Sequence, residues 1–223
     1  MEFASFFVIF VKMILKNLIM EEAKTGEVKL YSIAEYLALE EKSLEKNEYR
    51  NGKIMAMSGG TFAHAILGGN ISTQLNIGID KNNQDCVVTN SDLKLFIEKA
   101  KRFVYPDAVV LCDEPEYFKN DKNAVINPII IIEVLSDSTE KYDRGEKFRL
   151  YSSLPSFKEY ILIDQHQPIV DTLFREDATY WKTQTTIGLD KSFPIHTLGF
   201  EINMSDLYKK VPNLKSPQIN LDF

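Results

Sequence analysis

Residues 128–135 have the sequence Pro-Ile-Ile-Ile-Ile-Glu-Val-Leu, and this run predicts the central strand of a β-sheet. A short β-branched run without polar alternation is typical of a strand that is covered on both faces. Residues 139–153 favour a helix, and residues 160–164, Tyr-Ile-Leu-Ile-Asp, favour a second buried strand. A strand, a helix and a strand in this order predict a parallel pair joined by a right-handed crossover.

The residues before this run predict two helices and a hairpin. Ser32 and Glu35 form a capping-box pattern at the start of a short helix. Asn51-Gly52 tolerates the positive φ angles of a two-residue turn, and it predicts a hairpin within residues 48–57. A long helix is expected where apolar side chains recur at every fourth position, at Leu67, Ile71, Leu75 and Ile79.

Further strands are expected on both sides of the central run. Successive strands of a β-meander are expected at residues 86–89, 93–97 and 103–112, with a polar loop at residues 120–123. Residues 169–200 alternate apolar and polar side chains and predict more strands, before a final short helix near residues 205–211. The predicted fold class is α/β, with a mixed sheet flanked by helices and additional antiparallel strands toward the C-terminus.

The composition is that of a globular protein with a sizeable core. Of the 223 residues, 44% are apolar and 26% are charged, which excludes collagen-like, low-complexity and wholly disordered chains. The formal net charge of −6 argues against a protein that coats nucleic acid through charge alone, but not against a nuclease whose carboxylates gather a metal ion. We expect a single domain over residues 28–212, an N-terminal extension of no assigned function over 1–27, and a tail over 213–223.

The sequence also bears on the compartment of the protein. The apolar run of residues 6–15 is shorter than the roughly 20 residues of a bilayer span, and no small-residue cleavage site of a signal peptide follows it. Cys86 and Cys112 lie apart, without a CxxC motif or a histidine at metal-ligand spacing. The sequence therefore predicts two buried thiols, neither a disulfide nor a zinc site, and a cytoplasmic protein without a membrane span.

Glu133 needs a partner, because an unpaired carboxylate among four isoleucines costs several kcal/mol. A second acid, Asp107, follows Pro106 at the start of the strand-like residues 108–111. If the two strands are neighbours in one sheet, the two carboxylates meet at one edge, and Mg²⁺ is the natural counter-charge. The alternative is that Asp107 only caps a turn and that Glu133 pairs with a lysine or an arginine.

A set of short motifs, in order along residues 28–212, resembles one known family. The motifs are Glu48-Tyr49-Arg50-Asn51-Gly52-Lys53, Met57-Ser58-Gly59-Gly60, His64, Ser91-Asp92-Leu93-Lys94, Tyr105-Pro106-Asp107, Glu133-Val134-Leu135-Ser136, Asp143-Arg144-Gly145-Glu146-Lys147-Phe148 and Glu159-Tyr160. Together they resemble the Uma-type putative restriction endonuclease family, within the PD-(D/E)xK nuclease superfamily. The resemblance implies a restriction-endonuclease-like fold.

The resemblance also implies an activity and a site. The activity is that of a Mg²⁺-dependent endonuclease that hydrolyses phosphodiester bonds of DNA, with Mn²⁺ as a substitute metal. Asp107 and Glu133 are the implied metal ligands, with the carbonyl of Val134 as a third ligand and Glu48 as a supplementary acid. His64 matches a histidine of the family motif and is a candidate catalytic residue.

The chain departs from the parent pattern at one position. Leu135 stands where a lysine is expected, and an alkyl chain can neither orient a water nor offset charge on the transition state. We expect Lys147 to replace that lysine, because residues 144, 147 and 151 share one helical face and Lys147 would lean toward the strand edge beside Tyr151. Lys94 is the competing candidate, and either lysine has the alternative of a solvated surface side chain.

Two other functions stand beside the DNA endonuclease. Leu135 and the net charge of −6 favour a catalytically silent member of the fold, used as a binding or assembly module. A small-molecule phosphodiesterase would share the metal site but would need a closed pocket. Family analogy further implies a homodimer. Contacts to DNA phosphates are expected from two basic clusters, Lys99, Lys101 and Arg102, and Lys141, Arg144, Lys147 and Arg149.

Overall fold

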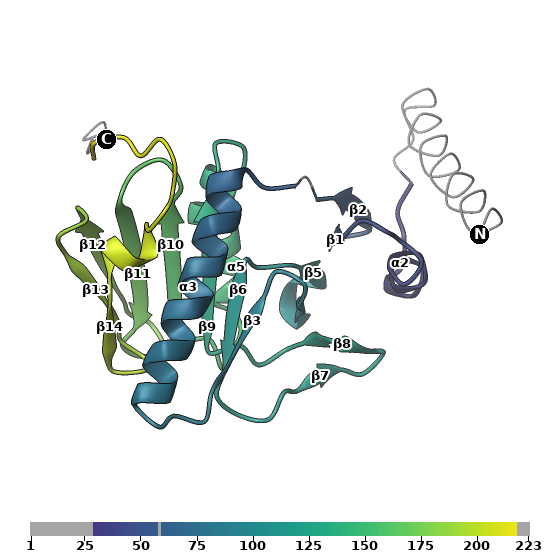
Figure 1. The fold of residues 1–223 in the computed structure, drawn as a ribbon. Helices are drawn as coiled ribbons and strands as arrows, with labels where there is room; N and C mark the ends of the chain where they lie inside the picture. Colours follow the sequence, from purple (N-terminus) through teal and green to yellow (C-terminus); the bar gives the residue numbers. More distant parts are fainter. Residues whose placement is uncertain (1–28, 58, 218–223) are drawn as a thin grey trace, which may run out of the picture.

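The structure, a computed structural model, describes residues 29–57 and 59–217. The predicted extension over residues 1–27 lies outside the described residues, as does part of the predicted tail. Two six-stranded sheets and one two-stranded sheet are flanked by helices, so the predicted α/β class with a mixed sheet is confirmed. In Figure 1 the long helix α3 (Phe62–Lys81) lies in front of one large sheet, and α2 (Ile33–Glu40) lies to its side.

The isoleucine-rich run forms an interior strand of the first large sheet. The strands of this sheet are β3 (Val87–Asn90), β6 (Ala108–Leu111), β9 (Ile130–Leu135), β10 (Glu159–Asp164), β11 (Ile169–Arg175) and β12 (Trp181–Ile187). Their order is β12-β11-β10-β9-β6-β3. Strand β9 is parallel to β10 and antiparallel to β6, which confirms the predicted parallel pair.

Both faces of β9 are covered, as the sequence of the run predicts. The even-numbered side chains of β9 pack with the apolar stripe of α3. The odd-numbered side chains Ile131 and Leu135 pack on the opposite face, with Tyr151 and Phe157. Glu133 lies between them in sequence and is only 3% exposed. Full burial of each apolar side chain contributes about 1.5–3 kcal/mol, so this strand is held firmly from both sides.

The second large sheet carries the predicted hairpin. Its strands are β1 (Asn47–Arg50), β2 (Lys53–Ala56), β4 (Lys94–Ile97), β5 (Arg102–Val104), β7 (Tyr117–Phe118) and β8 (Asp121–Val125), in the order β2-β1-β5-β4-β8-β7. The β1–β2 hairpin turns at Asn51 and Gly52, whose φ angles are 50° and 90°. The Asn-Gly dipeptide therefore has the role that the sequence predicts.

Two expectations about these strands are wrong. The strands over residues 86–112 do not form a meander, because β3 pairs with β6 while β4 and β5 belong to the other sheet. The run over residues 103–112 is two strands, divided at Pro106, which cannot donate a ladder hydrogen bond. The polar residues 120–123 are not a simple loop, since they form the turn and the start of the β7–β8 hairpin.

The helices follow the predicted pattern, with one departure. In α2 the capping box of Ser32 and Glu35 is formed, and α3 buries its predicted stripe. The expected helix over residues 139–153 is divided into α4 (Glu140–Tyr142), a π-helical turn η2 (Asp143–Lys147) and α5 (Phe148–Tyr151). The remaining helices of the described residues are the 3-10 turn η1 (Glu98–Ala100) and α6 (Met204–Leu207), which is shorter than expected.

The two-stranded sheet, β13 (Ser192–Ile195) and β14 (Phe200–Asn203), lies beside α3. The approach of the two elements is close at Gly78, where a Cβ atom would come within 2.3 Å of the ring of Phe200. Only glycine allows α3 to pack at this distance without displacing that ring.

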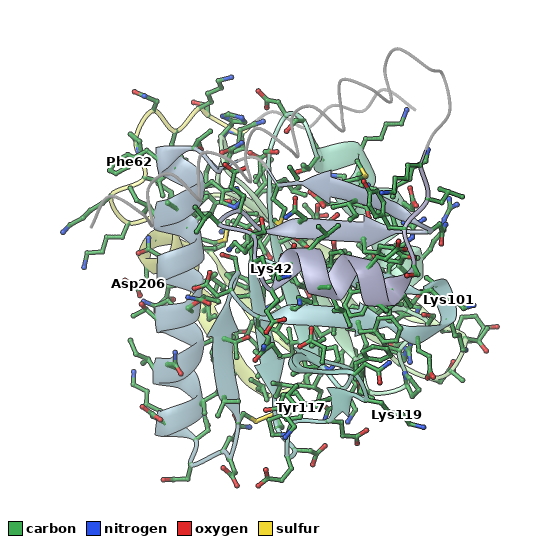
Figure 2. All side chains as sticks on the ribbon, turned by 90° about the vertical axis from the view of Figure 1, so that its right-hand side faces the viewer. Lys42, Phe62, Lys101, Tyr117, Lys119 and Asp206 are labelled. Carbon is green, nitrogen blue, oxygen red and sulfur yellow. A yellow bond between two sulfur atoms is a disulfide. The ribbon has the colours of Figure 1, made fainter. Side chains whose placement is uncertain are left out.

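The prediction of two free thiols is wrong, because Cys86 and Cys112 form a disulfide with an S–S distance of 2.06 Å. Val87 of β3 pairs with Leu111 of β6, so the cysteines occupy the next opposed position of the same ladder. The bond is drawn in yellow in the lower part of Figure 2. Within the described part of the chain, no helix is long and apolar enough to cross a membrane.

Candidate active site

The two predicted acids stand on neighbouring strands. Ala108 of β6 pairs with Ile132 of β9, so Asp107, one residue before β6, lies opposite Glu133. The Oδ2 atom of Asp107 accepts a hydrogen bond from the backbone N–H of Val134 at 2.7 Å. The structure therefore brings together Asp107, Glu133 and the backbone of Val134, as the sequence predicts for neighbouring strands.

Glu133 accepts hydrogen bonds from two buried side chains. Its Oε1 atom lies 2.9 Å from Nζ of Lys147 and 2.8 Å from the hydroxyl of Tyr151. Burial raises the pKa of Glu133, Lys147 lowers it, and repulsion by Asp107 and Asp143 raises it again, to about 8. The prediction that Lys147 leans toward this acid beside Tyr151 therefore agrees with the structure, and so does the alternative in which Glu133 pairs with a lysine.

Lys147 is buried between two carboxylates and is not a solvated surface side chain. Its Nζ atom lies 2.9 Å from Glu133 and 2.9 Å from Oδ1 of Asp143, which is 2% exposed. Burial alone would lower the pKa of Lys147, but Glu133, Asp143 and Glu48 outweigh it and raise the pKa above the ordinary value. Lys147 therefore carries its proton at neutral pH.

Asp143 is the site residue that sequence reasoning leaves without a role. It belongs to the quoted motif, and the spacing of residues 143, 147 and 151 by four was the signal that could have placed it at the site. The π-helical turn η2 keeps all three side chains on the buried face of the segment. The backbone carbonyl of Asp143 also accepts a hydrogen bond from the Tyr160 hydroxyl at 3.1 Å.

Glu48 approaches the site from the second sheet. It is 5% exposed, so it is a buried acid and not an exposed charge of the β1–β2 hairpin. Its Oε2 atom accepts hydrogen bonds from Arg50, whose guanidinium lies 4.1 Å from the ring centre of Tyr142. Glu48 is close enough to Lys147 to raise the pKa of that lysine.

His64 lies on the first turn of α3, where its backbone N–H donates to the hydroxyl of Thr61. The ring Nε2 is 2.9 Å from Oδ1 of Asp107, and this contact raises the pKa of His64. Lys94, by contrast, pairs with Asp121 of β8 at 2.8 Å. Of the two candidate lysines, only Lys147 contacts Glu133.

The residues fit a hard divalent cation by their chemistry. Within residues 29–57 and 59–217, no group of three or more His, Cys, Asp or Glu side chains is arranged to hold a metal ion. The acids Glu48, Asp107, Glu133 and Asp143 nevertheless outnumber the nearby cations Lys147 and Arg50. Carboxylate oxygens are the ligands that Mg²⁺ prefers. Burial is the main cause of the raised pKa of Glu133, and a cation would offset the smaller contribution from repulsion by Asp107 and Asp143.

The two predicted basic clusters lie close together. Arg102 of β5 forms an ion pair with Glu146 of η2 at 2.5 Å, which joins the turn of residues 98–102 to the helical segment. A cavity of about 670 Å³ lies elsewhere, between α2, Lys94 and the β7–β8 turn, and Asp107 and Glu133 do not line it. Asp107 and Glu133 therefore lie outside this cavity, whereas a small-molecule phosphodiesterase would need its metal ligands inside a closed pocket.

Comparisons with known proteins agree with this architecture. The model of the Uma2 family, described as a putative restriction endonuclease, matches residues 33–205. Two uncharacterized proteins of Synechocystis are similar: slr1290 is 37% identical over 78% of this chain and 90% of its own length, and sll1609 is 38% identical over 61% of this chain and 76% of its own length. The crystal structure of a putative nuclease of Anabaena variabilis, from the family DUF820, has a TM-score of 0.62 at 18% identity, over 78% of this chain and 96% of that one, so the two share a fold.

Proposed function

Because this chain belongs to the Uma2 putative restriction endonuclease family, we propose that it is a Mg²⁺-dependent endonuclease that hydrolyses phosphodiester bonds of DNA. One observation carries the proposal: Asp107 and Glu133 stand opposite each other on adjacent strands, with Lys147 in contact with Glu133. This is the group of two acids and a lysine that the nuclease pattern requires, with the lysine supplied by η2 in place of Leu135.

In this proposal Asp107, Glu133, the carbonyl of Val134 and Glu48 would hold Mg²⁺, or Mn²⁺ in its place. When bound, the ion polarises the scissile phosphate and lowers the pKa of its water. Glu133 must lose its proton to serve as a ligand, and its pKa of about 8 makes this easier as the pH rises. His64 and the N–H of Val134 fix the two oxygens of Asp107, so that the carboxylate keeps one orientation.

Lys147 supplies a fixed positive charge beside the acids. Two of its contacts are to Glu133 and Asp143, and an ammonium group has three N–H donors. Its third donor has no hydrogen-bond acceptor among the described residues. It would be free to bind a phosphate oxygen and to offset the charge that develops on the phosphorus centre.

The catalytic unit of this proposal is residues 28–212. Cutting both strands of a duplex calls for two copies of the chain, so we also propose a homodimer. Light scattering on the purified protein measures its mass and distinguishes a dimer from a monomer.

A catalytically silent binding module is the second candidate function. The observation that favours it is that Oε1 of Glu133 already accepts hydrogen bonds from Lys147 and Tyr151. A silent protein would keep this pair as part of its core, whereas an enzyme would retain one free oxygen of Glu133 for the metal. Cleavage assays separate the two functions.

The test is the cleavage of supercoiled plasmid with Mg²⁺ or Mn²⁺, beside a lane with EDTA. We expect nicking that requires the metal and that falls by about 100-fold or more in Asp107→Asn, Glu133→Gln and Lys147→Gln. Glu201→Gln is the matched control, because Glu201 is an exposed carboxylate on β14, away from the acids. No metal-dependent cutting, or equal cutting by all the variants, would refute the endonuclease and favour the silent module.

A further inference from the structure

We propose that Arg144 is a phosphate-binding residue that holds the DNA backbone beside the cleavage site, and that Asp171 and Thr185 fix its orientation. The inference rests on the proposed function for the identity of its ligand. Arg144 would give the DNA a second binding contact besides the metal site, next to a strand that lies two strands from Glu133 in the same sheet.

Arg144 is oriented by two carboxylates. Its Nη1 atom donates to Oδ2 of Asp171 at 2.6 Å, and its Nε atom donates to Oε1 of Glu140 at 2.8 Å. Asp171 is itself fixed, because its Oδ1 atom accepts a hydrogen bond from the hydroxyl of Thr185 at 2.6 Å. A guanidinium held on two sides keeps one orientation, and it loses little conformational freedom when it binds a ligand.

The other side of the guanidinium faces outward. The Arg144 side chain is 37% exposed, whereas the Asp171 side chain below it is 11% exposed. Among the described residues, the Nη2 group of Arg144 has no hydrogen-bond acceptor. The two N–H groups of one nitrogen diverge, so Nη2 can donate to a phosphate oxygen on its open side, with the positive charge of the guanidinium adding to the attraction.

The register of the sheet relates this arginine to the acids. Glu133 pairs with Leu162, Leu162 pairs with Asp171, and Asp171 pairs with Thr185. The four residues form one row across β9, β10, β11 and β12, so Asp171 lies two strand spacings from Glu133, or about 10 Å.

The ion pair alone does not account for this arrangement as a stability device. Pairs between partly exposed charges contribute little, because solvent screens them. Asp171 is nevertheless largely buried beneath an exposed arginine. A buried acid in this position has a clear role if it holds the Arg144 guanidinium toward a ligand. Arg144 also follows Asp143 directly, so the segment that places Lys147 at the scissile phosphate would place Arg144 at a neighbouring one.

The experiment measures binding without cleavage. A fluorescein-labelled DNA duplex is titrated with the full chain in EDTA, and anisotropy gives the Kd over a series of salt concentrations. Arg144→Gln should weaken binding by about five- to tenfold and reduce the slope of log Kd against log salt by about one. Arg144→Lys keeps the charge, so it should keep the slope and recover part of the affinity.

Two further variants test the orientation of Arg144 and the specificity of the effect. Asp171→Asn leaves Arg144 in place but removes the carboxylate that holds it, so binding should weaken by about two- to fivefold with an unchanged slope. Lys191→Gln is the matched control, because Lys191 also pairs with an aspartate but precedes β13, which packs on the α3 side of the sheet. Its Kd and slope should match those of the original protein. Circular dichroism at each salt concentration confirms that the variants are folded.

The outcomes separate this inference from the proposed function. Arg144→Gln with an unchanged Kd and slope overturns the phosphate site, even if the original protein cleaves plasmid. Binding that depends on Arg144 supports the site, even if no cleavage occurs and the endonuclease is refuted. A protein that binds no duplex at low salt overturns the phosphate site as well.

Discussion

Replacing Lys147 with methionine would remove the positive charge from between two buried carboxylates. The Nζ atom lies 2.9 Å from both Glu133 and Asp143, and all three side chains are less than one tenth exposed. Removing one partner of a buried pair costs about 3–5 kcal/mol, because the other charge is left uncompensated. We expect Lys147→Met to lower the free energy of unfolding by about 4 kcal/mol at pH 9.

The size of this loss should depend on pH through Glu133. The pKa of Glu133 is raised from 4.5 to about 8 with Lys147 present, and loss of the lysine raises it further. A raised carboxyl pKa means that the folded state binds more protons than the unfolded state, so stability falls as the pH rises from the unfolded pKa to the folded pKa. Below about pH 8 Glu133 keeps its proton in the folded state of both proteins, so both lose stability equally as the pH rises; above about pH 8 the variant loses up to about 1.4 kcal/mol more per pH unit.

Urea unfolding at pH 6 and pH 9 measures both effects. Trp181, the one tryptophan of the chain, packs against Phe148 and Phe157 in the same core, so its fluorescence reports unfolding there. Lys191→Met is the control and should change neither curve, because Lys191 is exposed. A loss below about 1 kcal/mol at pH 9, the scale of a solvated pair, or an equal loss at both pH values would refute the buried pairing.

Three other measurements test separate parts of the structure. The His64 ring should titrate above the ordinary histidine pKa, because the Asp107 carboxylate beside Nε2 favours the protonated form, and an NMR titration would measure this pKa. The stabilising contribution of this contact should be present at low pH and be lost as the pH rises through the folded pKa, so unfolding measured at each pH should show the loss. Replacing Cys86 and Cys112 with alanine should lower the free energy of unfolding by about 3 kcal/mol, since the bond closes a loop with a sequence separation of 26, and dithiothreitol should produce the same loss. Gly78→Ala should destabilise the fold by about 1–3 kcal/mol through overlap with an aromatic ring of β14, whereas Gly69→Ala, with open space around its Cβ on the same helix, should stabilise it by about 0.5–1 kcal/mol. Equal thermal shifts in the two glycine variants would contradict the close approach of α3 to β14.

Local patterns in the sequence predicted the local structure. The β-branched run of β9, the Asn51-Gly52 turn and the stripe of α3 each act over a few residues, so periodicity and turn chemistry reveal them. The parallel pairing of β9 with β10 followed from the order strand, helix, strand and the preferred hand of the crossover.

Non-local pairing was what the sequence did not reveal. Strands β4 and β5 follow β3 in the chain, yet they pair in another sheet while β3 returns to β6, and no periodicity encodes that choice. The Cys86–Cys112 bond was missed for the same reason, because it depends on the register of β3 against β6. Residue spacing alone also left open whether Lys147 or Lys94 contacts Glu133. The position of the η2 segment over β9 decides it in favour of Lys147.

The π-helical turn η2 lets one short segment hold contacts to both large sheets. Its neighbour Tyr142 stacks with Arg50 of β1, and within the turn Glu146 pairs with Arg102 of β5, Lys147 with Glu133 of β9, and Arg144 with Asp171 of β11. A π turn holds about one residue more than an α turn, so winding the same five residues with α geometry would rotate everything on one side of the turn away from its partners. Tyr142 could then no longer face β1 while Lys147 faces β9. Substitutions at Gly145 meet open space and should be tolerated, whereas a change that forces α geometry on this segment should break its contacts with one of the two sheets.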